Sequence, residues 1–156
     1  MKYKHIIWDW NGTLIDDAWL CVEIMNSLLK KRKLNSITIN DYREHFTFPV
    51  RDYYIKLGFD LMTESFEVCG MEFINEFKNR KFDASLYNQI ELILDQLTKM
   101  GLSHSILSAQ NQILLDETVA HYQLQNKFEG VIGLENHYAH SKVNIGKSWI
   151  ERLSFS

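Results

Sequence analysis

A short apolar run near the start of the chain, His5 to Trp8, ends on Asp9 and leads directly into Asn11-Gly12. A continuous apolar segment of this length that stops at an Asn-Gly turn is typical of a buried strand in a parallel sheet. Asp9 would then lie at the carboxyl end of that strand, where open α/β sheets place their ligand crevice. This stretch therefore predicts an α/β fold with a carboxylate at its binding site.

The turn after Asp9 carries groups that suit an anion. Gly12 lets backbone N–H groups come close to a phosphate, and Thr13 adds a hydroxyl. Asp9 is thus a candidate carboxylate nucleophile beside a phosphate-sized nest. Aspartate before Asn-Gly is also ordinary turn chemistry, so other segments must decide between the two interpretations.

The composition limits the classes of partner. The chain has 156 residues, of which 46% are hydrophobic, enough for one domain with a core. A formal net charge of -3 gives no general attraction to nucleic acid or anionic lipid, and the only basic run, residues 30–33, ends a helical pattern where cations suit the helix dipole. The two cysteines lack any paired spacing, and no apolar run has membrane-spanning length. We expect a soluble, cytoplasmic protein that binds neither nucleic acid nor membrane.

Residues 15–83 show helical periodicity throughout. The first expected helix runs from a cap at Asp16 or Asp17 to about Lys33, and a second, short helix follows a Thr38–Asp41 capping box. A third helix runs from Pro49 to Gly58, and a fourth from about Thr63 to Lys78. After Phe82 helices and strands alternate: a helix from Ile90 to Gly101, a strand at 102–109, a helix at about 113–122, a strand at 128–133 and a helix at 142–153.

This order predicts right-handed crossovers and a Rossmann-like, three-layer parallel sheet. We expect an α/β core of residues 1–14 and 84–156 with an inserted all-helical cap, residues 15–83. Because the cap follows the candidate nucleophile directly, we expect it to act as a lid over the site.

Three strand ends would converge on one crevice. They carry Asp9 with Asn11, then Ser108, then the loop from Gly133 to Lys142. Phosphoryl transfer through an aspartate needs a carboxylate, hydroxyl and backbone donors for the phosphate oxygens, a cation, and usually Mg²⁺. The protein groups among these are present at the strand ends.

At these residues the sequence resembles the haloacid dehalogenase-like hydrolases, and in organisation the phosphoglycolate phosphatases with a helical cap. The first family motif, D-x-D-G-T-[LV], corresponds to Asp9-Trp10-Asn11-Gly12-Thr13-Leu14. The second, a Thr or Ser after an apolar strand, corresponds to Ser108, and the third, a Lys after the next strand, to Lys142 with Lys147 as the alternative.

The resemblance implies a Mg²⁺-dependent phosphatase that acts on a small phosphorylated metabolite. Asp9 would attack the phosphorus and bind Mg²⁺, together with the backbone carbonyl of Asn11. Lys142 would balance the charge of Asp9 and of the phosphoryl group. The phosphate-binding residues would be Gly12, Thr13, Ser108, Ala109 and Lys142.

Asn11 departs from the family pattern. The family's second aspartate gives a proton to the leaving group and later activates water, whereas asparagine exchanges no proton near neutral pH. General acid–base catalysis is worth about 10²- to 10⁴-fold, so we expect a slow or inactive enzyme. Such an enzyme would accumulate phospho-Asp9 or would prefer substrates with a good leaving group.

A second departure concerns the family's fourth motif, an acidic pair or trio that completes the Mg²⁺ site. No residue before Ser156 matches it. In the family the strand that carries it lies beside the first strand. We therefore expect a truncated or degraded form of a longer hydrolase, in which His5 to Trp8 form an exposed edge that invites self-association.

Two alternatives remain open at this point. Glu135, His137 and His140 are close enough in sequence to bind a transition metal, although the loop lacks supporting cysteines. The chain could also be a non-catalytic phosphate- or protein-binding remnant of such a hydrolase. Substrate choice would lie in the cap, around Arg51 and Tyr54, where Arg51 could meet a second anionic group or remain a solvated helix residue.

Overall fold

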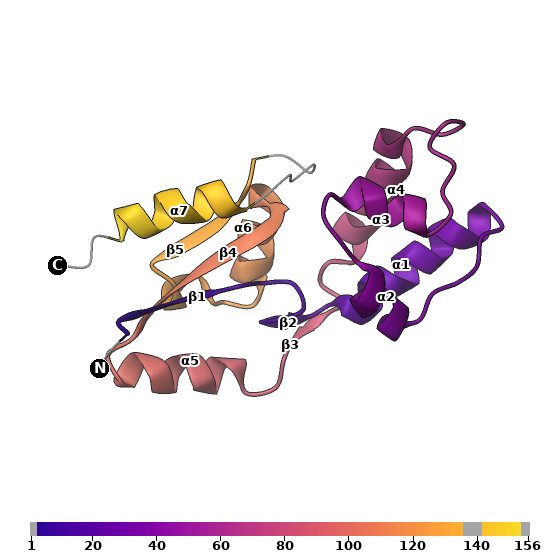
Figure 1. Cartoon of the computed structure of the whole chain (residues 1–156). Helices are drawn as coiled ribbons and strands as arrows, with labels where there is room; N and C mark the ends of the chain where they lie inside the picture. Colours follow the sequence, from indigo (N-terminus) through magenta and orange to yellow (C-terminus); the bar gives the residue numbers. More distant parts are fainter. Residues whose placement is uncertain (1–2, 136–141, 154–156) are drawn as a thin grey trace. The chain divides into compact units, whose positions relative to one another are not determined.

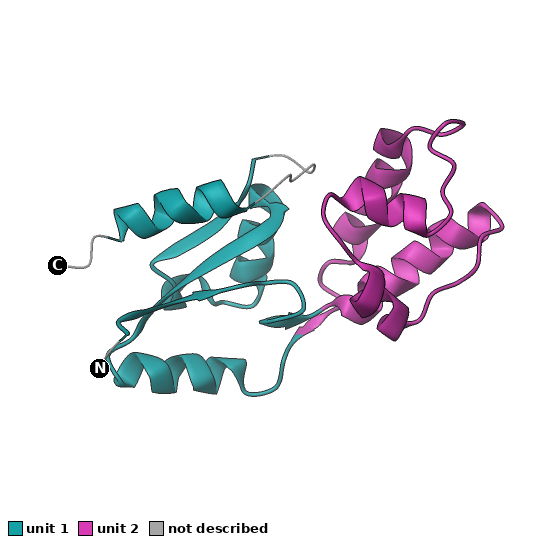
Figure 2. Ribbon diagram, in the orientation of Figure 1, with its two compact units in different colours: residues 1–16, 86–156 teal, residues 17–85 magenta. Residues whose placement is uncertain are grey.

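The computed structural model describes residues 3–135 and 142–153 (Figure 1). The chain forms two compact units (Figure 2). The α/β unit contains residues 1–16 and 86–156, and the helical unit contains residues 17–85. The chain therefore leaves the α/β unit once, shortly after Asp9, and returns to it once.

The α/β unit is built on a parallel sheet with β4 in the centre. Its strands are β1 (His5–Trp8), β4 (Ser103–Asn111) and β5 (Gly130–Leu134), in the order β1-β4-β5. His5 lies opposite Ser103 in the first pair, and Ser105 opposite Gly130 in the second. Because the strands are parallel, their carboxyl ends lie at the same edge of the sheet.

Helices cover both faces of this sheet. They are α5 (Ile90–Lys99), α6 (Gln112–His121) and α7 (Val143–Arg152), with a 3₁₀ turn at Gln125–Lys127. Trp149 of α7 donates a hydrogen bond to Ser105, whereas Thr98 of α5 meets His104. Neighbouring residues of a strand point to opposite faces, so α7 and α5 lie on opposite sides of β4, as Figure 1 shows. This three-layer arrangement confirms the predicted Rossmann-like core.

Two glycines let α7 lie close to the sheet. A Cβ atom on Gly146 would stand 2.7 Å from Cδ2 of Leu107, and one on Gly130 would stand 2.4 Å from the ring of Trp149. The Trp149 ring therefore fits over β5, where its Nε1 donates to Oγ of Ser105 at 2.9 Å. This contact holds the helix that Lys142 precedes.

Two buried histidines join β1 to its neighbours. Trp8 Nε1 donates to Nδ1 of His104 at 3.2 Å, and Nε2 of His104 is hydrogen-bonded to Thr98 Oγ1 at 3.2 Å. Nε2 of His5 is hydrogen-bonded to Ser105 Oγ at 2.8 Å. Burial lowers the pKa of both imidazoles, because a charged ring loses hydration there.

The helical unit consists of α1 (Ala18–Lys31), α2 (Ile39–His45), α3 (Val50–Lys56) and α4 (Phe66–Arg80). The predicted capping box is confirmed: Asp41 N donates to Thr38 Oγ1, and Thr38 N donates to Asp41 Oδ2. Gly58 follows α3 with φ of +94°, the left-handed conformation that glycine adopts without strain. Local sequence chemistry thus sets these helix ends.

The structure corrects the all-helical interpretation of residues 15–83 at its start. Ile15–Asp16 forms strand β2, which pairs with β3 (Ser85–Leu86) in a two-stranded sheet. Strands of two residues are too short to show alternation in the sequence. Asp17 stands at the N-cap position of α1, but its side chain makes no capping hydrogen bond.

Each unit has its own hydrophobic core of fully buried side chains. In the α/β unit they include Trp10, Leu14, Ile15, Leu94, Ile106, Leu115 and Leu124, and in the helical unit Leu20, Ile24, Leu28, Leu29 and Tyr53. Within the described ranges, no helix combines the length and the hydropathy needed to cross a membrane.

Candidate active site

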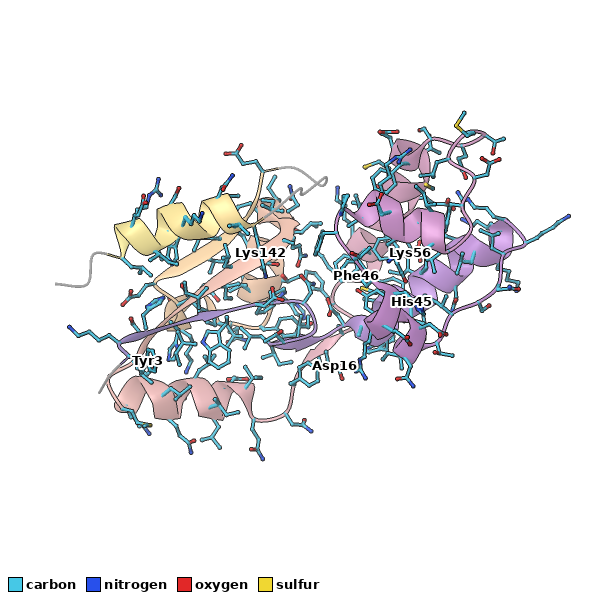
Figure 3. The ribbon with its side chains drawn as sticks, viewed as in Figure 1. Tyr3, Asp16, His45, Phe46, Lys56 and Lys142 are labelled. Atoms are coloured by element: carbon cyan, nitrogen blue, oxygen red, sulfur yellow. The ribbon has the colours of Figure 1, made fainter. Side chains whose placement is uncertain are left out.

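The candidate site lies at the carboxyl ends of β1 and β4. Asp9 follows β1 directly, and Lys142 stands at the N-cap position of α7 (Figure 3). Lys142 Nζ lies 2.8 Å from Oδ1 of Asp9 and donates a second bond to the carbonyl oxygen of Leu107 at 3.3 Å. The two charged side chains are partly exposed, 45% for Asp9 and 36% for Lys142. The fold therefore places a cation against the candidate nucleophile at a solvent-accessible position.

The packing of α7 explains how Lys142 reaches Asp9. Gly146 N donates to the carbonyl oxygen of Lys142 at 2.9 Å, so the two residues form the first helical turn. Gly146 packs on the side chain of Leu107, whose carbonyl oxygen is the one that Lys142 contacts. One residue of β4 thus positions both ends of this turn.

The turn after Asp9 is organised around the carbonyl oxygen of Trp10. This oxygen accepts from the amides of Thr13 at 3.2 Å, Leu14 at 3.0 Å and Ile15 at 3.2 Å. Gly12, with φ of +71°, donates its amide to the carbonyl of Ile15 at 3.0 Å. The amides of Gly12 and Thr13, two predicted phosphate ligands, therefore donate within the turn. The hydroxyl of exposed Thr13 is the group that this residue offers to an anion.

Ser108 and Asn11 are joined by a short hydrogen-bonded chain. Gln110 N donates to Ser108 Oγ at 3.1 Å, and Ser108 Oγ donates to Oδ1 of Asn11 at 3.3 Å. The chain forms where the β4–β5 ladder shifts its register, between Leu107 and Asn111. Ser108 is 1% exposed, so its hydroxyl serves Asn11 in a site shielded from water.

Two glutamines lie where β4 ends and α6 begins, Gln110 on β4 and Gln112 at the first position of α6, and no sequence motif pointed to them. Both amide atoms of the Gln110 side chain are buried and have no partner among the described residues. Gln112 Oε1 accepts from Gly133 N at 2.6 Å, and its Nε2 donates to the carbonyl of Val131 at 3.0 Å. Gln112 thereby ties the end of β5 to the end of β4. A glutamine at this junction gives no periodic or motif signal, which is why the sequence did not reveal the role of Gln112.

The remaining predicted site residues have different surroundings. Ala109 follows Ser108 on β4 and is partly buried, whereas Lys147 is exposed on α7. In the helical unit Arg51 is exposed on α3. Tyr54 is 2% exposed and packs on Phe59 and Phe66, with ring centroids at 4.7 and 5.3 Å. Of the two cap residues predicted to meet substrate, only Arg51 lies on the surface of its unit.

The oxygen donors at this edge suit Mg²⁺. Asp9 supplies a carboxylate and Asn11 a main-chain carbonyl, and Mg²⁺ commonly takes one or two carboxylates with several waters and a substrate phosphate. No group of three or more His, Cys, Asp or Glu side chains that could hold a metal occurs among the residues described. Glu135 is exposed, and His137 and His140, the other members of the alternative metal site, lie outside the described residues.

A protein family and several solved structures match this chain. Residues 6–154 match the family of haloacid dehalogenase-like hydrolases. A predicted phosphatase from Clostridium acetobutylicum has a TM-score of 0.79 at 20% identity, over 99% of this chain and 72% of that chain. A haloacid dehalogenase-like family hydrolase from Streptococcus pneumoniae has a TM-score of 0.80 at 15% identity, over 98% and 71%.

A predicted phosphoglycolate phosphatase from Haemophilus somnus also shares the fold, with a TM-score of 0.65 at 16% identity, over 87% of this chain and 66% of that chain. No curated protein matches the sequence. At these identities the likeness to solved structures concerns the fold.

Proposed function

The chain belongs to the haloacid dehalogenase-like hydrolases, and from this membership we propose that it is a phosphatase that transfers a phosphoryl group to Asp9. The contact of 2.8 Å between Lys142 and Asp9 carries the proposal. It joins an acid and a cation from distant parts of the chain at the ligand edge of a parallel sheet. The substrate is a small phosphorylated metabolite.

Asp9 acts as the nucleophile. One of its carboxylate oxygens bonds to phosphorus while the bond from phosphorus to the leaving oxygen breaks, and water later releases phosphate from the aspartyl-phosphate. The ammonium of Lys142 offsets negative charge on the carboxylate and on the phosphoryl oxygens. The amide of Ala109 and the Thr13 hydroxyl are the proposed donors to phosphate, whereas the Ser108 hydroxyl donates to Asn11.

Mg²⁺ is the proposed cofactor. The Asp9 carboxylate and the main-chain carbonyl of Asn11 would hold it, with waters completing the shell. When bound, it supplies positive charge next to the phosphoryl oxygens. The partly exposed Asp9 side chain, which Lys142 contacts through Oδ1, supports this assignment.

Asn11 makes this phosphatase slow. The amide stands two residues after the nucleophile and exchanges no proton near neutral pH, so neither departure of the leaving group nor attack of water receives acid–base help from it. The same residue favours a second candidate function, a phosphate-binding protein without turnover. The two candidates differ in whether Asp9 becomes phosphorylated.

The test is Mg²⁺-dependent phosphate release from 4-nitrophenyl phosphate by the wild type, Asp9→Asn and Asn11→Asp. We expect slow release by the wild type, none by Asp9→Asn, and an increase of about 10²- to 10⁴-fold in Asn11→Asp. Activity that survives in Asp9→Asn would overturn the assignment of Asp9 as the nucleophile. Phosphate binding without release in either the wild type or Asn11→Asp would favour the binding protein.

A further inference from the structure

The side chain of Asn11 is held in a defined orientation. Gln110 N donates to Ser108 Oγ, and the single hydroxyl proton of Ser108 is directed to Oδ1 of Asn11. Ser108 is almost fully buried, so bulk water does not compete for this proton. The oxygen of the carboxamide therefore faces β4, and the NH₂ group forms the other end of the side chain.

This arrangement affects how the leaving group departs. The NH₂ group of Asn11 can donate a hydrogen bond but cannot transfer a proton. Ser108 already uses its proton toward Asn11, and Lys142 is ion-paired with Asp9. An alkyl phosphate must expel an alkoxide, a strong base that leaves slowly without a proton. A carboxylate, whose conjugate acid has a pKa of about 4, leaves as a stable anion.

We propose that the preferred substrates are acyl phosphates, an inference that rests on the proposed function. An oxygen of Asp9 bonds to phosphorus, the bond from phosphorus to the acyl oxygen breaks, and the electron pair leaves with the carboxylate. No proton moves. The phosphoryl group passes from one carboxyl group to another of similar basicity, so the bond formed resembles the bond broken.

The same geometry slows the second half of the reaction. Hydrolysis of phospho-Asp9 needs an activated water, and the carboxamide of Asn11 accepts no proton. An acyl phosphate therefore phosphorylates Asp9 quickly, releases about one equivalent of carboxylate per chain, and then turns over slowly. Such burst kinetics are the fingerprint of a covalent intermediate that accumulates.

The experiment compares acetyl phosphate with ethyl phosphate, which differ by one carbonyl group in the leaving group. Phosphorylation of the full chain is followed by the mass of the acid-quenched protein, with Mg²⁺ present. The variants are Asn11→Asp and, as a control of equal charge, Asn75→Asp at an exposed position of α4. The ratio of the acetyl to the ethyl rate is the quantity compared, because it cancels changes common to both probes.

We expect this ratio to fall by about 10²- to 10⁴-fold in Asn11→Asp and to stay unchanged in Asn75→Asp. An unchanged ratio in Asn11→Asp, with Asp9 phosphorylated by both probes, would overturn this inference and leave the proposed function standing. Failure of both probes to phosphorylate Asp9 in the wild type and in Asn11→Asp would overturn both.

Discussion

Nζ of Lys142 lies 2.8 Å from Oδ1 of Asp9, across 133 residues of sequence. Both side chains are partly exposed, and ion pairs of this kind contribute about 0–1 kcal/mol to folding. The pair is therefore of more consequence for the chemistry at Asp9 than for the stability of the α/β unit.

Replacement of Lys142 tests whether the ion pair with Asp9 matters for catalysis and not for folding stability. We expect Lys142→Ala to lower kcat/KM for 4-nitrophenyl phosphate by about 10²- to 10³-fold, because a charge that stabilises the transferring phosphoryl group is lost. The melting temperature should stay close to that of the wild type. Lys147→Ala removes an equal charge from an exposed position of α7 and should leave both quantities unchanged. Equal loss of activity in the two variants would contradict the assignment of Lys142.

Gly133 should tolerate no side chain. A Cβ atom there would stand 2.7 Å from the carbonyl oxygen of Gln110 and 2.9 Å from Cα of Gln112, both backbone atoms that cannot turn aside. We expect Gly133→Ala to lower the free energy of unfolding by about 1–3 kcal/mol, measured by urea denaturation. Gly146→Ala should cost less, since the obstructing atom is a methyl group at the end of the Leu107 side chain. A larger loss of stability in Gly146→Ala than in Gly133→Ala would show that the ends of β4 and β5 are joined less tightly than these distances indicate.

The stability of the α/β unit should fall in mild acid. The folded pKa values of His5 and His104 lie below 6.5, so the unfolded chain takes up protons near 6.5 while the folded chain does not. Stability is complete above pH 6.5 and declines as the pH falls from 6.5 toward the folded pKa values. Urea unfolding followed by tryptophan fluorescence, about one pH unit above and below 6.5, measures the loss.

His104→Gln should remove part of this pH dependence, because the amide cannot be protonated. His45→Gln serves as the control, since His45 is exposed in the helical unit. If the free energy of unfolding changes equally with pH in the wild type and in His104→Gln, groups other than His104 cause the loss of stability in acid.

The outer edge of β1 is the proposed site of self-association. Ser103 N donates to the carbonyl of Lys4, and the alternation of a parallel ladder then turns the amide of Ile7 away from β4. An apolar edge of this kind pairs readily with another strand. We expect sedimentation to show association that grows with protein concentration, and exchange of the Ile7 amide to slow in parallel. Association without slower exchange at Ile7 would place the contact elsewhere.

The order of strands and helices could be predicted because it depends on local signals. Apolar periodicity located β1, β4 and β5, and the Thr38 capping box and Gly58 marked helix ends before any contact was known. Parallel strands share one ligand edge, so the expectation that Asp9, Ser108 and Lys142 would gather there also followed from topology.

The details of the site could not be predicted, because they depend on register and packing. The two-residue strands β2 and β3 are too short for a periodic signal. The hydrogen bond from Ser108 to Asn11 forms where the pairing of β4 with β5 shifts its register. No residue type in the sequence signals such a shift. Tyr54 looked suited to meet a substrate, but its helix turns it into an aromatic core.

The carbonyl oxygen of Trp10 holds the turn that carries Asn11 by backbone bonds alone. An aspartate at position 11 would leave these bonds intact, and its Oδ1 could accept the same hydroxyl proton from Ser108. The codons for asparagine and aspartate differ by one base. A single point mutation could therefore restore a proton-exchanging side chain on an unaltered backbone, so that gain and loss of fast turnover are neighbouring steps in the evolution of this chain.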